Sequence, residues 1–322
     1  MNVQALQKII KYKILTSKSF GRLIPMSSKQ KQYSDELQAE FEQIPAADTS
    51  NLSGAALEWA TNMNTLRHHV FNYDIRRFLR WDVIRATMFV SYAAYIKQEL
   101  ESIKNSKDFE SYWKRGIKES SVGLPIKSKL YRKSSGNLIH HAYHVQQFEE
   151  VIGMKVGEID LVLEFGGGYG SLCRLIQNLG FNKKYVIFDL PLFSSLQKYY
   201  LKSLGHKVLN VNDFSKSESG VLCISNFEDL QKALNNVDST KRNLFVATWS
   251  LSETPIILRR KIIELITDFE YFLIAYQDKF NEVDNNHFFG NMQKEMSHVN
   301  WKGWKIKHLP GNNYLIGKGL NH

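Results

Sequence analysis

Apolar residues recur every three or four positions over roughly the first 130 residues, where no alternating pattern appears. This spacing is typical of amphipathic helices. It predicts helices over residues 33–44, 53–71, 72–103 and 107–119, with Ser34 and Asp35 near the start of the first. We therefore expect residues 1–130 to form an all-helical N-terminal region.

The pattern changes after residues 121–137, which hold Gly123, Pro125 and Gly136 and are typical of a loop. One more helix is predicted over 137–153. Short β-branched runs then alternate with helical stretches; the runs are 161–165, 184–190, 221–226, 243–250 and 271–277. A close pair of runs near the end, 304–309 and 313–319, predicts a hairpin. This rhythm predicts an α/β fold over residues 131–322, a doubly wound, mostly parallel sheet with an antiparallel C-terminal hairpin.

A run of glycines lies between the first expected strand and the helix after it, in "LVLEFGGGYGSLCRLI". Ligands of open α/β sheets bind beyond the carboxyl ends of the strands, which is where this run lies. The spacing is Glu164-x-Gly166-x-Gly168-x-Gly170, whereas dinucleotide-binding proteins have G-x-G-x-x-G or a closing alanine. The third position counted from Gly166 is Ser171, so the dinucleotide pattern fails. A turn that serves only tight helix–strand packing is the alternative.

Two carboxylates indicate what this bend would bind. Glu164 stands two residues before the turn, where it would repel a pyrophosphate and attract a cationic group. S-adenosylmethionine offers such an end, with an ammonium and a sulfonium. Asp189 follows the second strand and lies nineteen residues after Gly170, where an acid can accept the hydroxyls of a ribose. Together the glycines and the two acids predict an S-adenosylmethionine site.

The residues expected at this site come from four strand ends. Adenine contacts usually follow the third strand, which is either 221–226, ending in Ser225 and Asn226, or the competing run 207–213. The sequence does not decide between the two. The expected cofactor-binding residues are Glu164, Gly166, Gly167, Gly168, Tyr169, Gly170, Asp189, Leu190, Ser225, Asn226 and Trp249.

The chain resembles the class I S-adenosylmethionine-dependent methyltransferases, and within them the sugar O-methyltransferases of bacterial surface-glycan gene clusters. Five stretches carry the resemblance: "FLRWDVIRATMF", "LEFGGGYGSLCRLI", "YVIFDLPLFSSLQKYYL", "FVATWSLSETP" and "HLPGNNYLIG". They span most of the chain from about residue 78 onward. The resemblance implies a Rossmann-like fold, S-adenosylmethionine as cofactor and methylation of a sugar hydroxyl in glycan biosynthesis.

A sugar hydroxyl is a poor nucleophile, so a general base or a metal should help to remove its proton. Glu253, at the fourth strand end, is the first candidate base; the alternative is that Ser252 or Thr254 caps the next helix and Glu253 only favours its dipole. The other candidates are His140 and His141. Since His140 and His144 lie one helical turn apart, they would share a face and serve as metal ligands or as base and orienter. No metal is assigned.

Acceptor contacts are expected from two places. The helix over 137–153 offers Tyr143 and His144, and the strand ends offer Ser252, Gln277 and Asn286. Amides and carboxylates in an expected long loop over 277–287 suit hydrogen bonding to a sugar. An ordinary polar loop is the alternative.

Composition and charge narrow the function classes. The 322 residues are 43% hydrophobic and carry a formal net charge of +10, but the basic residues are scattered and no basic tract appears, so no nucleic-acid partner is expected. Only Cys173 and Cys223 are present, which fits a reducing, cytoplasmic compartment. The longest apolar runs are too short to span a bilayer. The basic N-terminal 26 residues allow a peripheral membrane helix, with a loosely docked terminus as the alternative.

Three functions stay open at this point. The first is a sugar O-methyltransferase whose acceptor is nucleotide- or lipid-linked, with the helical N-terminal region shaping the acceptor pocket or a homodimer contact. The second is an RNA or protein methyltransferase. The third is a cofactor-binding scaffold without catalysis, against which the intact Glu164, glycines and Asp189 argue.

Overall fold

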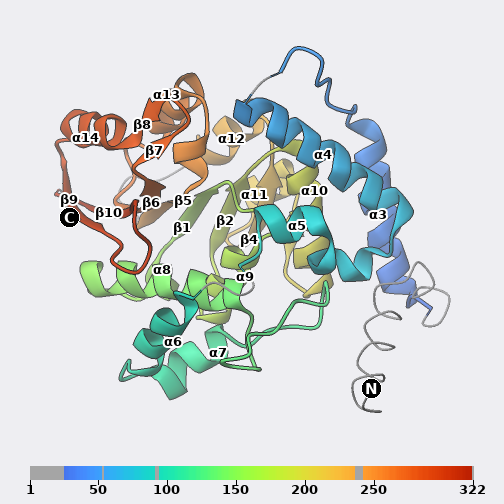
Figure 1. The fold of residues 1–322 in the computed structure, drawn as a ribbon, viewed down its shortest axis with the longest axis horizontal. Coiled ribbons are helices and arrows are strands. Elements are labelled where there is room, and N and C mark those ends of the chain that lie inside the picture. The colour runs from blue at the N-terminus through green and yellow to red at the C-terminus, as the bar shows by residue number, and fades with distance from the viewer. Residues whose placement is uncertain (1–24, 53, 91–93, 236–241, 321–322) are drawn as a thin grey trace. The chain divides into compact units, whose positions relative to one another are not determined.

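A computed structural model describes residues 25–52, 54–90, 94–235 and 242–320 (Figure 1). The chain divides into two compact units: residues 1–89 with 120–126, and residues 90–119 with 127–322. This division differs from the expected boundary at residue 130. The reason is that helix α6 (Ile96–Lys104) packs on α8 (Gly136–Ile152), where the Ser102 hydroxyl donates to Gln146, so residues 90–119 belong with the sheet.

The first unit contains α3 (Ser28–Gln43), α4 (Gly54–Asn72), the 3-10 helix η1 (Ile75–Arg80) and α5 (Asp82–Thr87). Helix α3 begins before the expected residue 33 because Ser27 and Gln30 form a capping box. The single helix expected over 72–103 is wrong. The Asp74 side chain caps η1 at the Arg76 N–H, and α5 and α6 are separate helices after it.

The second unit is built on an eight-stranded sheet in the order β3-β4-β2-β1-β5-β6-β10-β9. In that order the strands are Val208–Leu209, Gly220–Ile224, Lys184–Phe188, Leu161–Phe165, Asn243–Thr248, Tyr271–Gln277, Asn312–Gly319 and Val299–Lys305. All neighbouring strands are parallel except β10, which runs antiparallel to both β6 and β9. The expected doubly wound, mostly parallel sheet with an antiparallel C-terminal hairpin is confirmed.

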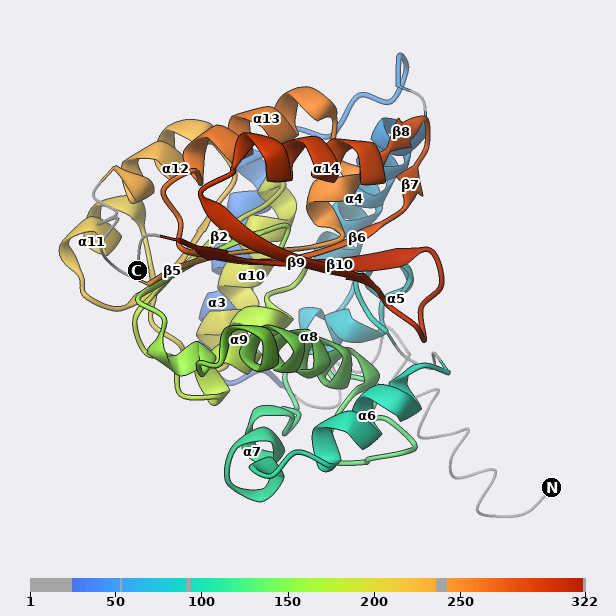
Figure 2. The ribbon, with the colours of Figure 1, turned by 90° about the vertical axis from the view of Figure 1, so that its left-hand side faces the viewer.

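Helices cover both faces of this sheet. They are α8, α9 (Ser171–Asn178), α10 (Pro191–Ser203), α11 (Val211–Lys216), α12 (Phe227–Leu234), α13 (Ile256–Leu265) and α14 (Asn285–Glu295). Figure 2 shows α8 and α9 on one face and α12, α13 and α14 on the other. Leu161, Leu163 and Phe165 of β1 belong to the apolar core that also holds Ile262 of α13 and Phe289 of α14. Because side chains alternate along a strand, Glu164 points to the opposite face, toward α9.

Shorter elements replace two expected features. The loop expected over 277–287 forms a small hairpin of β7 (Lys279–Phe280) and β8 (Val283–Asp284), after which Asp284 caps α14 at the His287 N–H. The helix expected over 107–119 is a π-helical turn, η2 (Phe109–Trp113), followed by α7 (Lys114–Gly116). A further 3-10 turn, η3 (Val156–Glu158), precedes β1. Within the described ranges, no helix has the length and apolar character needed to cross a bilayer.

Candidate functional site

The glycine bend joins β1 to α9 and has a conformation that other residues rarely adopt. Gly166, Gly168 and Gly170 have φ angles of 74°, 57° and 90°, and Gly170 stands at the N-cap of α9. An L side chain at these positions would be strained. The backbone geometry therefore accounts for the three alternating glycines.

Close packing accounts for part of the same run. A Cβ atom at Gly166 would lie 2.3 Å from Cβ of Ser250, and one at Gly167 would lie 2.5 Å from Cγ2 of Ile187. The interpretation of the glycines as a tight packing turn thus holds for Gly166 and Gly167. A role in holding a ligand rests on the backbone of the bend and on the two carboxyl groups beside it.

Glu164 is buried next to the bend, with 4% of its surface exposed. Its Oε2 accepts a hydrogen bond of 2.8 Å from the Tyr185 hydroxyl, and no Lys or Arg of the described chain forms an ion pair with it. Burial raises the pKa of Glu164 to about 8; the negative charge of Asp189 acts in the same direction, and the Tyr185 hydrogen bond opposes it. A bound cation would stabilise the ionised carboxylate.

Asp189 follows β2 and fixes the bend from the other side. Its Oδ2 accepts hydrogen bonds from the Gly168 N–H (3.0 Å) and from Nε2 of Gln197 (2.8 Å), and its Oδ1 accepts from the Leu190 N–H (2.7 Å). Nε2 of Gln197 also lies 2.9 Å from the Gly168 carbonyl oxygen. Burial raises the pKa of Asp189 to about 7, although these hydrogen bonds oppose the shift. The sequence reasoning missed Gln197, which lies on α10 eight residues after Asp189.

The open question of the third strand is decided by the pairing of β4 with β2. Phe188 lies opposite Ile224, so Ser225 and Asn226 follow in register beside Asp189, while β3 lies at the edge of the sheet. The Asn226 side chain caps α12, accepting from the Asp229 N–H at 2.8 Å and donating to the Asp229 carboxylate. Since the amide of Asn226 is engaged in this cap, Ser225 and the exposed Leu190 are the nearer candidates for an adenosyl group.

Tyr169 does not offer its side chain to a ligand in this structure. It is 2% exposed, and its hydroxyl accepts a hydrogen bond of 2.8 Å from Nδ2 of Asn137. The ring packs edge-on against Tyr200. Only the backbone of Tyr169 remains as a contribution to the bend.

Trp249 follows β5 in a strained conformation, with φ 66° and ψ −37°. Its N–H donates to the Ala275 carbonyl at 2.7 Å and its indole Nε1 donates to Oδ1 of Asn312 at 2.6 Å. A non-glycine residue held in this way costs about 1 to 3 kcal/mol, and such strain is concentrated at functional sites. The next residue, Ser250, donates to the Phe165 carbonyl and so joins this turn to the end of β1.

His140 lies against that turn. The His140 and Trp249 rings are stacked, with centroids 5.4 Å apart and planes 24° apart. Nδ1 of His140 lies 2.8 Å and 3.0 Å from the two oxygens of Glu99, and Nε2 of His308 lies 3.0 Å from Oε1 of the same carboxylate. Glu99 is fully buried on α6. The Glu99 carboxylate of α6 therefore joins His140 to His308, although the three residues are remote in sequence.

The Glu99 carboxylate decides the tautomer of His140. Burial alone would raise the pKa of Glu99, but hydrogen bonds from His140 and His308 outweigh it and the pKa is lowered. An ionised carboxylate only accepts hydrogen bonds, so Nδ1 of His140 carries a hydrogen, and in the neutral imidazole the lone pair lies on Nε2. Nε2 of His140 has no hydrogen-bond partner among the described residues.

The other two histidines of α8 differ from His140. His144 shares its face as expected, with ring centroids 4.2 Å apart, but it is fully buried and its Nδ1 is hydrogen-bonded to the Tyr314 hydroxyl. Burial lowers the pKa of His144 well below its usual value and that of His141 to about 3. His141 has no carboxylate partner in the part of the chain that is described. Nor does that part hold a group of three His, Cys, Asp or Glu suited to a metal ion.

The turn after Trp249, the 3-10 helix η4 (Ser250–Glu253), is held by Gln277. Nε2 of Gln277 donates to Oε1 of Glu253 at 3.2 Å, and the buried Ser252 hydroxyl lies 2.7 Å from Oε1 of Gln277. The alternative that Ser252 or Thr254 caps the next helix is wrong. Pro255 is the N-cap of α13, and the Thr254 hydroxyl donates to the Leu251 carbonyl.

Arg259 was missed by the sequence reasoning and orders the same region. It is fully buried and donates to the Thr254 carbonyl (2.7 Å), the Ser252 carbonyl (2.5 Å) and Oδ1 of Asn285 (2.7 Å). Burial lowers the pKa of Arg259 to about 10. Its acceptors are all neutral, so this arginine is a structural tie between η4 and α14.

Two expected acceptor contacts lie in polar surroundings. Asn286 stands in the first turn of α14, not in a loop, and its Nδ2 donates to Oδ1 of Asp278 at 3.1 Å. Asn313 donates to the same oxygen at 2.7 Å, and these hydrogen bonds lower the pKa of Asp278. Tyr143 is half-buried, with its ring edge-on to that of His308 at 5.1 Å.

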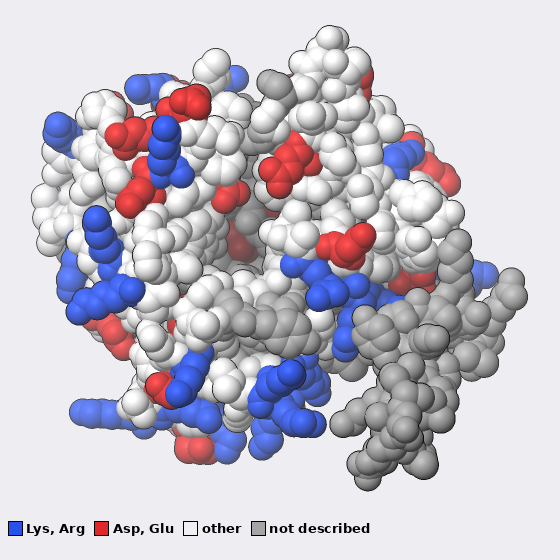
Figure 3. Space-filling model, viewed as in Figure 1, with Lys and Arg blue, Asp and Glu red and all other residues white. Residues whose placement is uncertain are grey.

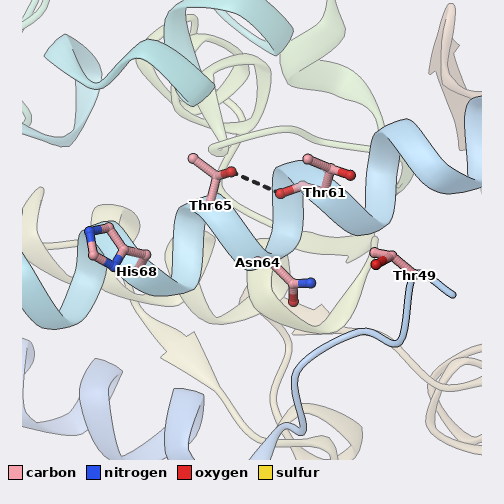
Figure 4. Close-up of a pocket in the computed structure, with 5 residues that line it drawn as sticks. All are labelled: Thr49, Thr61, Asn64, Thr65 and His68. Carbon is pink, nitrogen blue, oxygen red and sulfur yellow. Dashed lines mark hydrogen bonds between the residues drawn. The ribbon is translucent and has the colours of Figure 1, made fainter.

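A cavity of about 380 Å³ lies in the first unit (Figure 4). It is lined by Thr49, Thr61, Asn64, Thr65 and His68. Both Thr61 and Thr65 donate to carbonyls of their own helix, and the Asn64 amide is paired with the backbone of Ala47. No titratable pair points into it, and we assign it no role.

Comparison with protein-family models finds no match, and comparison with curated proteins finds none either. Three solved structures illustrate the similarity that comparison of the fold finds. The N-terminal domain of human METTL16 in complex with SAH has 9% identity and a TM-score of 0.38, covering 57% of this chain and 71% of that one. The precorrin-6y C5,15-methyltransferase of Geobacter metallireducens has 11% identity and a TM-score of 0.37, covering 60% and 92%. The Methanococcus jannaschii fibrillarin pre-rRNA processing protein has 11% identity and a TM-score of 0.37, covering 52% and 70%. With TM-scores below 0.5, these likenesses carry nothing about activity or acceptor to this chain.

Proposed function

We propose that this protein is an S-adenosylmethionine-dependent O-methyltransferase that methylates a sugar hydroxyl and uses His140 as its general base. The observation that carries the proposal is the pairing of His140 with the buried Glu99, at the strained Trp249 turn. That turn follows β5, the strand next to β1, and β1 leads into the glycine bend. The proposed base on α8 thus lies beside the end of β5, and the proposed donor site lies at the end of the neighbouring strand β1.

The residues around the bend fit the proposed cofactor. Its ammonium and sulfonium would supply the positive charge that the buried Glu164 lacks, and Asp189, already held by Gly168 and Gln197, would accept a ribose hydroxyl. The pyrophosphate of a dinucleotide would supply no such charge and would be repelled by the ionised form of Glu164. When bound, the cofactor supplies an activated methyl group for in-line transfer.

His140 would take the proton from the acceptor hydroxyl at its free Nε2. Glu99 holds the Nδ1 hydrogen and would stabilise the imidazolium that forms. General bases positioned in this way contribute about 10²- to 10⁴-fold to a rate. Glu99 acts through His140 and is a positioning residue; sequence reasoning placed no acid there.

The sugar acceptor is the finer part of the proposal. It is supported by the five stretches that resemble the sugar O-methyltransferases and by amide and carboxyl groups near η4, chiefly Gln277, Asp278 and Asn286. Aromatic faces at Trp249 and Tyr143 suit stacking on a sugar ring. The acceptor would be nucleotide- or lipid-linked, with the helical N-terminal region shaping its pocket or a contact between two copies of the chain.

Methyl transfer from labelled S-adenosylmethionine to a panel of sugar nucleotides and extracted glycans tests this function. We expect mass spectrometry to show one methyl group added to a sugar hydroxyl, with unchanged yield in a chelator because the base is a histidine. Methylation of RNA or of a protein substrate in parallel reactions, with none of the glycans labelled, would contradict the sugar acceptor.

Donor binding should release a proton. At pH 7 most of the Glu164 side chains are protonated, because the pKa of Glu164 is raised to about 8, and a bound cation favours the ionised form. We expect a net release of about one proton per donor bound at pH 7, falling as the pH rises above 8. Calorimetry in buffers of different ionisation enthalpy measures this release.

Glu164→Gln is the matched variant, since it keeps the shape and the Tyr185 contact but cannot ionise. It should remove most of the released proton and weaken donor binding; any remainder would come from Asp189, whose pKa is about 7. An equal release from the variant and the wild type would show that Glu164 does not face the cationic end of the donor.

A further inference from the structure

The segment between Lys127 and Ser135 is an ordered hairpin with an apolar tip. Lys127 and Ser135 form an antiparallel bridge at its base, and the Ser128 N–H donates to the Ser134 carbonyl at 2.9 Å. The Leu130 N–H donates to the Ser128 hydroxyl at 3.2 Å. The Leu130 side chain is nevertheless 52% exposed. An ordered loop therefore presents a leucine to solvent.

Cations surround this tip. The exposed basic residues of the hairpin are Lys127, Lys129, Arg132 and Lys133, and Lys104 of α6 lies over the Tyr131 ring at 5.2 Å from its centroid. In Figure 3, Lys and Arg gather over the part of the surface where Figure 1 places α6 and α7. The hairpin and Lys104 of α6 thus form one basic face.

The acids of the segment that contains the hairpin are engaged elsewhere. The segment from Lys104 to Lys133 contains Asp108, Glu110 and Glu119 as its acids. Each is already in an ion pair, with Lys155, Lys114 and Arg174 respectively. These ion pairs therefore join the acids of the segment to cations outside the hairpin.

We propose that the hairpin 127–135 docks the protein on an anionic lipid bilayer. Leu130 would enter the acyl boundary, Tyr131 would lie at the headgroup level, and the surrounding cations would contact lipid phosphates. A nucleic acid would use the cations but leave the exposed leucine without a role, whereas a bilayer accounts for both. The inference does not depend on the proposed methyl transfer.

Co-sedimentation of the full chain with vesicles tests this surface. We expect binding to phosphatidylcholine vesicles that contain phosphatidylglycerol, weakening as salt rises, and little binding to phosphatidylcholine alone. The triple variant K127Q/R132Q/K133Q should lose roughly 100-fold in partition coefficient, about fivefold per cation. Leu130→Ser should lose about fivefold to tenfold through the apolar contact.

Matched variants test whether vesicle binding depends on the hairpin itself or only on the number of exposed cations and apolar side chains of the protein. K216Q/K294Q/K302Q removes three exposed lysines elsewhere, and Ile257→Ser removes a side chain that is 74% exposed on α13. Both should bind the vesicles as the wild type does, with unchanged melting temperatures for all variants. The proposal is overturned if the wild type ignores the anionic vesicles, if control and hairpin variants bind equally, or if the hairpin variants lose RNA binding but keep vesicle binding.

Discussion

Replacing His140 by alanine is expected to lower kcat by about 10²- to 10⁴-fold while donor affinity changes by less than about threefold. The reason is that Nε2 of His140 is the atom proposed to take the acceptor proton, whereas the donor would be held by Glu164 and Asp189. Single-turnover kinetics, followed by formation of the methylated product, give the rate of the step, and titration with the donor gives its affinity. Added imidazole should restore part of the rate of His140→Ala, which a purely structural loss would not allow.

Glu99 should behave as a positioning residue for the same step. Glu99→Gln keeps the shape of the side chain but removes the negative charge beside Nδ1 of His140. We therefore expect kcat to fall by about tenfold or more, with KM for the donor little changed. A higher kcat in Glu99→Asp than in Glu99→Gln would show that the negative charge at this position matters for the step.

Two controls test whether the effect belongs to His140. His141→Gln changes the neighbouring histidine of α8, which has no carboxylate partner among the described residues, and should retain kcat within about threefold. Glu253→Gln tests the other candidate base. Full activity of His140→Ala would remove His140 as the base, and a large loss of kcat in Glu253→Gln beside it would place the base at η4 instead.

Asp189→Ala should weaken binding of S-adenosylmethionine by about 100-fold or more. The change removes the proposed ribose acceptor and also leaves the Gly168 N–H and Nε2 of Gln197 without their carboxylate oxygen. Hydrogen bonds to charged groups contribute about 1.5 to 3 kcal/mol each, so loss of the bonds that Asp189 would accept from the two ribose hydroxyls accounts for the expected weakening. Isothermal titration calorimetry measures the affinity.

Glu228→Ala, at an exposed acid in the first turn of α12, is the control for Asp189 and should leave the affinity within about twofold. Gln197→Leu should weaken binding by an intermediate amount, because Asp189 stays but the bend loses one of its ties. Equal affinities for Asp189→Ala and the wild type would remove Asp189 from the donor site.

Features set by neighbouring residues were predictable from the sequence. Strand–helix alternation gave the parallel sheet, and the failed dinucleotide spacing singled out Glu164 and the glycine bend, since conformation at Gly166, Gly168 and Gly170 is a local property. The one-turn spacing of His140 and His144 likewise placed both rings on one face. The helix expected over 72–103 failed because periodicity continued through residues where Asp74 caps a new helix.

Features made by contacts between remote residues were not predictable. Glu99 lies 41 residues before His140, and His308 follows it by 168 residues, so neither spacing nor composition links the three. A signal was present, since Glu99 interrupts the apolar face of α6 formed by Ile96, Leu100 and Ile103. A buried acid on such a face needs a partner, but the sequence does not name it.

Burial in the folded chain also changed which of the predicted site residues can contact a ligand through their side chains. Tyr169 and Ser252 were expected to contact ligands, but their hydroxyls hydrogen-bond within the protein at positions 2% and 0% exposed. Trp249 takes a positive φ that no sequence pattern indicates for a tryptophan. The outcomes at Trp249 and Ser252 depend on how η4 packs beside β6, and the outcome at Tyr169 depends on contacts with α8 and α10. Such contacts form only in the folded chain.

The most direct test of a pocket for a cationic adenosyl donor is a side-by-side calorimetric titration of the full chain with S-adenosylmethionine and with NAD⁺ at pH 7. We predict saturable, one-to-one binding of S-adenosylmethionine and at least about tenfold weaker binding of NAD⁺, because the buried Glu164 carboxyl group favours a cation over a pyrophosphate. Absence of heat with S-adenosylmethionine, or tighter binding of NAD⁺, would contradict the assignment.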